Sequence, residues 1–263
     1  MTKLNGKVLI TGEGGGIGTA IARRISPASS SLVLSARRTD QVEQLAAELG
    51  ASVLACDLED RLQVAQLAES AKDVDVAIMN AALPASGDLL DYEIGQIDRA
   101  IEVNLRAPLV LARLLAEQMA SRGGGHIVFI SSLAGKAASA GSCMYSATKF
   151  GLRGAAISMR ADWADKNVGV SVVCPGFVSD AGMFADSGAR LPKGIKTVSP
   201  QEVAEGVVRA VAKNKLEIDV APIPLKVGAS FAVVAPAAWE ALNRRTGGSN
   251  LSDHMSESQK HKR

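Results

Sequence analysis

The chain reads Lys7-Val8-Leu9-Ile10-Thr11-Gly12-Glu13-Gly14-Gly15-Gly16-Ile17-Gly18 near its start. The apolar run before the first glycine is typical of a parallel strand that is buried on both faces. After the glycines, apolar residues recur at Ile17, Ile21 and Ile25, which is the spacing of one helix face. The segment therefore predicts a strand, a glycine turn and a helix in succession.

The same alternation of short apolar runs and helical patterns continues along the chain. It predicts strands at 7–11, 32–35, 52–56, 74–79, 126–130, 170–174 and 217–221. Helices are predicted between them, including one long helix over 97–121 and one that carries Tyr145 and Lys149. This order predicts an α/β fold, a Rossmann-type doubly wound parallel sheet of seven strands that binds ligands at the carboxyl ends of its strands. We assign 1–245 to this single domain and expect 246–263 to form a disordered tail.

Composition narrows the class of partner. The 29 basic and 27 acidic residues nearly cancel and form no basic stripe, which favours a small-molecule substrate over a nucleic acid. Cys56, Cys143 and Cys174 have no metal-ligand spacing, so we expect reduced thiols, no metal and a cytoplasmic protein. The N-terminus has no charged-then-apolar leader, and we expect no secretory signal.

The glycine turn predicts a phosphate site. Glycines without Cβ let the backbone approach a pyrophosphate, and the N-terminus of the following helix offers free N–H groups. The residues expected to contact it are Gly12, Gly15, Gly16, Ile17 and Gly18. A flexible surface turn is the alternative. Glu13 would repel a phosphate, so we expect its side chain to face solvent.

The end of the second predicted strand selects the dinucleotide. An acid at this place binds the ribose of NAD, whereas an arginine there accommodates the extra phosphate of NADP. The chain reads Ser35-Ala36-Arg37-Arg38, and its first acid, Asp40, comes later. We therefore predict NADP(H), with Arg37 as the leading contact and Arg38 as a second. The alternative is a pair of solvated arginines in a loop.

Tyr145 and Lys149 form a candidate acid–base pair. Residues four apart share one helix face, so an ammonium can lie beside a phenol, and Ser131 and Ser132 precede them. Such a pair is not specific alone, because a tyrosine can precede a solvated lysine by one helical turn by chance. The glycine turn and the two arginines make a catalytic pair the better interpretation.

With these motifs together, the chain resembles the short-chain dehydrogenase/reductase family, in its branch of about 250 residues, over residues 5–222. The resemblance implies four catalytic residues, namely Asn104, Ser132, Tyr145 and Lys149, with Ser131 as the alternative serine. It also implies further cofactor contacts at Asp57, Leu58, Asn80, Pro175, Gly176 and Val178. In such an enzyme the tyrosine transfers a proton and the serine binds the substrate oxygen. The lysine lowers the tyrosine pKa and holds the cofactor, and the asparagine holds a water of the proton relay.

The chain departs from the family pattern at three places. The usual Asn-Asn-Ala-Gly motif is here Asn80-Ala81-Ala82-Leu83, which removes the conformational freedom of the glycine. Asp180 replaces a threonine that commonly contacts the cofactor carboxamide. Glu13 is the third departure. None of the three changes a proposed catalytic side chain.

Two apolar segments bear on the substrate. Met183 and Phe184 in a glycine-flanked loop predict a mobile lid, and the apolar segment 227–239 predicts a docked helix at a subunit contact or over the pocket. Attachment to a membrane surface is the alternative for this segment, which is too short to span a bilayer. Together the two segments favour a lipophilic ketone or secondary alcohol as substrate.

The chain could instead be a non-catalytic NADP(H)-binding regulatory protein of the same fold, although a pure binder needs no tyrosine acid. An epimerase or dehydratase would use the same tyrosine but usually has a longer substrate domain. The family resemblance implies a homodimer or homotetramer built on the helices that begin near Ile97 and carry Tyr145.

Overall fold

The computed structural model describes residues 3–12, 14–188, 191, 195–246 and 257–258. The prediction for Glu13 lies outside these residues, as does the predicted tail except for Thr246, Glu257 and Ser258. Both predictions therefore stay untested. Thr246 itself is the last residue of a helix.

A seven-stranded sheet forms the centre of the described structure, and every neighbouring pair of its strands is parallel. Its strands are β1 (Lys7–Thr11), β2 (Ser31–Ala36), β3 (Ser52–Ala55), β4 (Val76–Met79), β5 (Gly125–Ile130), β6 (Val168–Pro175) and β7 (Glu217–Val220). The order is β3-β2-β1-β4-β5-β6-β7, so the chain reverses its direction of travel between β1 and β4. The predicted doubly wound fold is confirmed.

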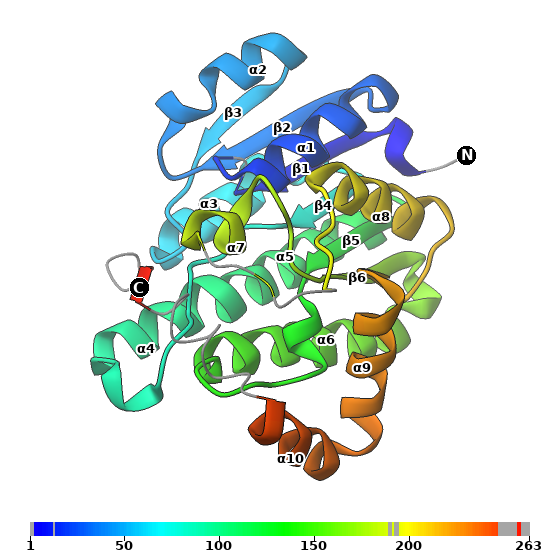
Figure 1. The fold of residues 1–263 in the computed structure, drawn as a ribbon. Coiled ribbons are helices and arrows are strands. Elements are labelled where there is room, and N and C mark those ends of the chain that lie inside the picture. The colour runs from blue at the N-terminus through cyan, green and yellow to red at the C-terminus, as the bar shows by residue number, and fades with distance from the viewer. Residues whose placement is uncertain (1–2, 13, 189–190, 192–194, 247–256, 259–263) are drawn as a thin grey trace.

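Helices cover both faces of the sheet (Figure 1). They are α1 (Gly16–Ile25), α2 (Glu43–Leu49), α3 (Arg61–Ser70), α4 (Ile94–Ile101), α5 (Ala107–Ser121), α6 (Cys143–Asp162), α7 (Gly182–Ser187), α8 (Pro200–Ala212), α9 (Ile223–Val234) and α10 (Pro236–Thr246). Helices α3, α5 and α6 pack on one face, and α1, α2 and α8 pack on the other.

Strand β1 shows why its sequence is a continuous apolar run. Leu9 belongs to the core beneath α3, α5 and α6, whereas Val8 and Ile10 belong to the core beneath α1 and α8. Successive side chains of a strand point to opposite faces, so a strand covered on both sides needs apolar residues at every position. All three side chains are fully buried.

The predicted long helix over 97–121 is wrong in its detail. Helix α4 begins at Ile94, and a π-helical turn at Glu102–Arg106 separates it from α5. Such turns widen the hydrogen-bonding pattern and occur mostly at functional sites, where they reorient one side chain. Asn104 lies in this turn. Apolar periodicity cannot report it, because one extra residue in a turn hardly changes the pattern.

The apolar segment 227–239 is divided between α9 and α10. The division falls at Ala235, because the proline that follows disfavours the helical conformation of the residue before it. One side of α9 faces the interior, while Val227 and Phe231 on the other side are exposed. None of the described helices is both long and apolar enough to cross a membrane. Attachment to a membrane surface stays a prediction.

Candidate active site

A large cavity of about 1430 Å³ lies at the carboxyl ends of the strands. It brings together segments that are far apart in sequence, from the glycine turn after β1 to the residues after β6. The predicted site residues that line it are Gly12, Gly15, Ile17, Gly18, Arg37, Arg38, Asp57, Leu58, Asn80, Ser132, Tyr145, Lys149, Pro175, Gly176 and Val178. Of the predicted set, Gly16 and Asn104 do not line it.

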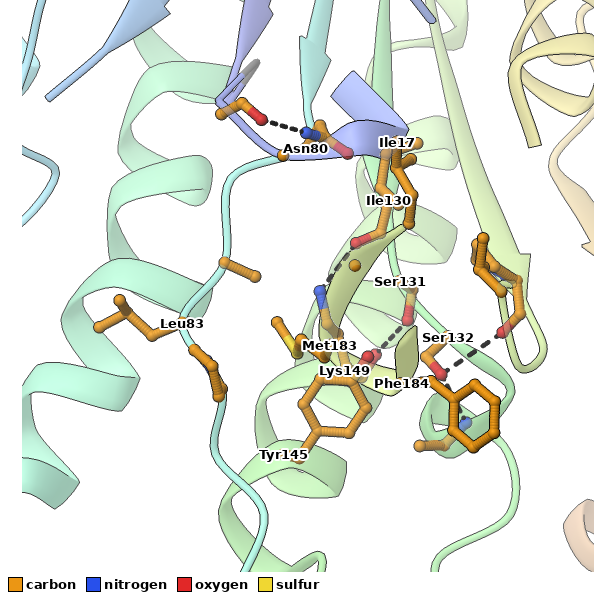
Figure 2. Close-up of a pocket in the computed structure, with 18 of the residues that line it drawn as sticks. Ile17, Asn80, Leu83, Ile130, Ser131, Ser132, Tyr145, Lys149, Met183 and Phe184 are labelled. Atoms are coloured by element: carbon orange, nitrogen blue, oxygen red, sulfur yellow. Dashed lines mark hydrogen bonds between the residues drawn. The ribbon is translucent and has the colours of Figure 1, made fainter. Parts of the chain in front are cut away.

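Gly12 begins the turn after β1. Its φ is +79°, and a Cβ there would lie 2.5 Å from the Cα of Ala81, so both conformation and space require glycine. Asn80, at the end of β4, fixes the turn from the other side (Figure 2). Its Nδ2 donates to the carbonyls of Thr11 and Gly12 at 3.1 and 2.9 Å. Asn80 therefore holds the shape of the glycine turn.

The turn leads into the open N-terminus of α1. Gly15 is the N-cap residue, and no side chain caps the helix there. Gly14 and Gly15 both line the cavity. A Cβ added to either glycine would have its nearest neighbour at 3.6 or 3.8 Å, so the space next to both is open. Free N–H groups, the positive end of the helix dipole and a backbone without side chains together fit a phosphate.

Gly16 packs closely against another segment, and its predicted contact with the cofactor stays a prediction. A Cβ on Gly16 would lie 2.3 Å from the Cβ of Ala181, so this glycine allows α1 to pack against the segment after β6. We expect Gly16→Ala to destabilise the protein by about 1–3 kcal/mol, because the backbone must shift to relieve the contact. Gly14→Ala is the matched control and should cost little. Urea unfolding of both variants measures this, and equal stabilities would contradict it.

Arg37 and Arg38, which follow β2, line the cavity and are exposed. Arg37 Nη1 is 3.9 Å from Glu59 Oε1, a long and weak ion pair. The same Glu59 oxygen accepts a hydrogen bond from Arg99 Nε at 2.5 Å. Arg37 is therefore held loosely and can turn toward an anion in the cavity at small cost.

Ser131 and Ser132 point to different partners. Ser131 Oγ is buried and donates to the carbonyl of Lys149 at 2.9 Å, which fastens the strand end to α6. Ser132 Oγ accepts from the N–H of Ala134 at 3.1 Å and donates to the carbonyl of Pro175 at 3.4 Å. Its side chain also acts on the Tyr145 phenol, whose pKa it lowers. The geometry thus distinguishes the two serines and favours Ser132 as the one that meets a substrate.

Tyr145 and Lys149 both come from α6, and the ammonium lies near the phenol ring while it donates to a main-chain carbonyl. Lys149 Nζ donates to the carbonyl of Ile130 at 2.9 Å and lies 5.6 Å from the centre of the Tyr145 ring (Figure 2). Burial raises the pKa of Tyr145, and its hydrogen bond with Ser132 opposes this. Burial also lowers the pKa of Lys149 to about 8.

These directions correct one expectation from the sequence. Lys149 was expected to lower the tyrosine pKa, whereas in this structure the loss of solvent dominates and raises it. The physical reason is that burial removes hydration from the phenolate. The ammonium of Lys149, which donates to the Ile130 carbonyl, does not compensate for this loss. A phenol with a raised pKa is protonated at neutral pH, and it is therefore a proton donor.

Asn104 lies behind the cavity wall and is almost fully buried. Its Oδ1 accepts from the N–H of Leu83 at 2.6 Å, and its Nδ2 donates to the Leu83 carbonyl at 2.9 Å. The amide therefore pairs with the backbone of the segment after β4. The missing family glycine at this position causes no strain, since Leu83 does not have a positive φ. Asp180, the other departure, is exposed with a φ of +61° and does not line the cavity.

Part of the apolar segment 227–239 lies over the cavity, which is one of the two places expected for it. Leu225 and Ala229 of α9 and Trp239 and Asn243 of α10 line the cavity. Trp239 Nε1 donates to the carbonyl of Ala138 at 3.1 Å, which fastens α10 to the loop before α6. In each helix the two lining residues are four apart, a spacing that places them on one helix face. Only the fold shows that these two faces point to the cavity.

Two of the three cysteines are buried. Burial raises the pKa of Cys56 to about 11 and that of Cys174 to about 12, so both remain unreactive thiols. Cys143 is exposed, and all three are unpaired. No group of acidic, cysteine or histidine side chains among the described residues could hold a metal ion.

The comparison with known families is decisive. A family model described as short chain dehydrogenase matches residues 6–191, which is more than half of the chain. The protein is a short-chain dehydrogenase. It is therefore an oxidoreductase of this family, and the resemblance drawn from its motifs is confirmed.

Individual short-chain dehydrogenases are similar over most of the chain. The ketoacyl reductase HetN of Nostoc sp. is 36% identical over 235 residues, which cover 86% of this chain and 82% of HetN. A short-chain dehydrogenase from Sphingobium yanoikuyae, solved in complex with NADPH, is 26% identical with a TM-score of 0.75 and covers 92% of this chain and 94% of its own. A variant of actinorhodin polyketide ketoreductase, solved with NADPH, is 26% identical with a TM-score of 0.75. The match covers 84% of this chain and 97% of the ketoreductase.

Proposed function

We propose that the protein is an NADP(H)-dependent reductase of lipophilic ketones, and of the corresponding secondary alcohols in reverse. One observation carries the proposal. The same cavity joins an anion-binding glycine turn, two arginines, the trio Ser132, Tyr145 and Lys149, and an apolar end. Relatives named as ketoacyl or polyketide ketoreductases support the carbonyl substrate, and two structures solved with NADPH support the cofactor.

The residues divide the work as follows. Bound NADPH supplies a hydride to a carbonyl carbon. Ser132 donates a hydrogen bond to the carbonyl oxygen and fixes it next to the phenol. Tyr145, whose raised pKa keeps the phenol protonated at neutral pH, gives that oxygen its proton. Lys149 places a positive charge near the developing phenolate, and Asn104 holds the Leu83 backbone that closes this side of the cavity.

Arg37 is proposed to select NADPH over NADH by pairing with the additional phosphate. We expect Arg37→Ala to weaken NADPH binding about tenfold or more while NADH binding stays the same, because a charge-assisted contact is lost only with the phosphate-bearing cofactor. Fluorescence titration with both cofactors measures this. Arg23→Ala, which removes an exposed arginine of α1 outside the cavity, is the control, and equal affinities of the wild type for the two cofactors would contradict the proposal.

The apolar end of the cavity supports a lipophilic substrate. Leu83, Met183, Phe184, Leu225 and Trp239 line it, and the rings of Phe177 and Phe184 pack at a tilt of 58° with centroids 5.1 Å apart. A panel of ketones of graded size and polarity, followed by the absorbance of the reduced nicotinamide, tests this. Turnover of small polar ketones alone would reject the lipophilic class. A non-catalytic NADP(H)-binding regulator would bind the cofactor and reduce none of them.

The assembly proposed for this chain is a homodimer or homotetramer through α4 and α6. Large apolar side chains are exposed on these helices, at Ile94, Ile101, Phe150 and Ile157. Light scattering of the purified protein measures the mass directly. A cytoplasmic location also stays a proposal, supported by the unpaired cysteines.

A further inference from the structure

A buried lysine follows the turn that carries Ser132. Lys136 is only 5% exposed, and its ammonium donates to Glu217 Oε1 at 2.6 Å and to the two oxygens of Asp219 at 3.0 and 2.8 Å. Glu217 and Asp219 are two apart on β7, so their side chains share one face of the strand. The end of the Ser132 turn is therefore fastened to β7.

Glu217 also holds the helix of the tyrosine. Its second oxygen, Oε2, accepts a hydrogen bond from Arg153 Nε. Arg153 is four residues after Lys149 on α6, one helical turn away along the same side. The two oxygens of one carboxylate thus bind two separate elements, the turn that presents Ser132 and the helix that presents Tyr145.

The contact between these two elements is close where they meet. Ser131 Oγ donates to the carbonyl of Lys149, and a Cβ on Gly135 would lie 2.7 Å from that same carbonyl. The turn therefore cannot move closer to α6, and a movement away from α6 would break the hydrogen bond of Ser131. A small displacement would change the distance between Ser132 and Tyr145, because the two side chains come from the two separate elements, the turn and α6.

A contribution to stability does not by itself explain this cluster. Burying Lys136 and partly burying Glu217, Asp219 and Arg153 costs hydration free energy, and apolar residues in such places are often equally stabilising. Buried charge pairs are instead suited to fixing one geometry, since carboxylate and ammonium must meet at defined positions. The cluster lies directly behind the residues whose relative position matters for proton transfer.

We propose that Glu217 is a positioning residue, which keeps Ser132 in register with Tyr145 by binding Lys136 with one oxygen and Arg153 with the other. The inference rests on the proposed roles of Ser132 and Tyr145 in ketone reduction. It assigns to β7 a part in the reaction, although no residue of β7 touches the reacting atoms.

A double-mutant cycle with Ser132→Ala tests the proposal. We expect Glu217→Gln to lower kcat about tenfold to a hundredfold, because small misplacements of catalytic groups are costly, while the KM for NADPH stays within about twofold. In the Ser132→Ala background the same change should cost almost nothing, since Glu217 acts through that serine. If the double variant lost kcat by the product of the two single losses, the proposal would be overturned. Glu205→Gln removes an exposed carboxylate paired with Arg24 and is the control.

A second measurement does not depend on turnover. The chain has two tyrosines, so in a Tyr92→Phe background the absorbance of tyrosinate reports the pKa of Tyr145 alone. Glu217→Gln should raise that pKa in the same direction as Ser132→Ala, because both weaken the effect of Ser132 that lowers the pKa of Tyr145. An unchanged pKa would overturn the proposal, whereas a wild type without any ketone reduction would overturn only the proposed function. If Glu217→Gln fails to fold, Arg153→Gln breaks the α6 half of the bridge, and the same two outcomes apply.

Discussion

Tyr145→Phe is expected to lower kcat for ketone reduction by about 10²- to 10⁴-fold, because it removes the proton donor and keeps the ring. NADPH binding should be mostly retained, since the phenol contributes one contact among many along the cavity. Stopped-flow measurement of NADPH oxidation gives kcat, and fluorescence titration gives the dissociation constant.

Tyr92→Phe is the matched control for this change. Tyr92 is also largely buried, and its hydroxyl donates to the carbonyl of Ser86 at 3.2 Å, but it does not line the cavity. This variant should keep its turnover and lose only a little stability. Near-full activity of the Tyr145 variant, or equal losses in both variants, would refute the assignment of the proton donor.

Lys149→Met is expected to affect function and stability in opposite directions. Turnover should fall by about 10²-fold or more, because the ammonium no longer stabilises the developing phenolate, and NADPH affinity should fall with it. The apo protein, in contrast, should become more stable at neutral pH. Burial lowers the pKa of Lys149 to about 8 from its usual 10.5, so keeping this group charged at pH 7 costs about 3 kcal/mol.

The net gain in stability should be smaller. Methionine cannot replace the hydrogen bond to the Ile130 carbonyl, a loss of about 1 kcal/mol. About 2 kcal/mol remain, which corresponds to an increase in Tm of about 4–8 °C for a chain of this size. Unfolding without cofactor at pH 7 measures it. A lower Tm of the variant would show that the buried charge of Lys149 does not destabilise the folded protein.

The pH dependence of this difference provides a further check within the same experiment. Between pH 8 and 10.5 the unfolded chain binds more protons than the folded one, so the stability of the wild type rises with pH in this range. The advantage of Lys149→Met should therefore shrink above pH 8, vanish where the remaining penalty equals the lost hydrogen bond, and be reversed near pH 10.5. A difference that is constant across this range would contradict the lowered pKa.

Several elements could be predicted from local sequence because local physics forms them. The apolar run 7–11, the glycines after it and the period of Ile17, Ile21 and Ile25 require a buried strand, a tight turn and a helix wherever they occur. The end of α2 at Gly50, which has a φ of +62°, follows in the same way from the conformational freedom of glycine. The alternation of such units was sufficient to predict the sheet.

The π-helical turn at Asn104 could not be predicted in this way. Its side chain pairs with the backbone of Leu83, which is 21 residues away, and the gain from that pairing is absent from the helix pattern itself. The wall formed by Trp239 is similar, because the orientation of α10 depends on a hydrogen bond to Ala138 across the cavity. These features rest on contacts between distant segments.

By itself, the sequence determined the fold class, the family and the residue types of the site, since each follows from spacing along the chain. Only the tertiary structure distinguished Ser132 from Ser131, placed Gly16 against Ala181 and joined Lys136, Arg153 and Glu217. It also reversed the expected direction of the Tyr145 pKa. The reason is that a pKa and a catalytic geometry depend on burial and on charges brought close by folding, and neither is encoded by a residue's neighbours in sequence.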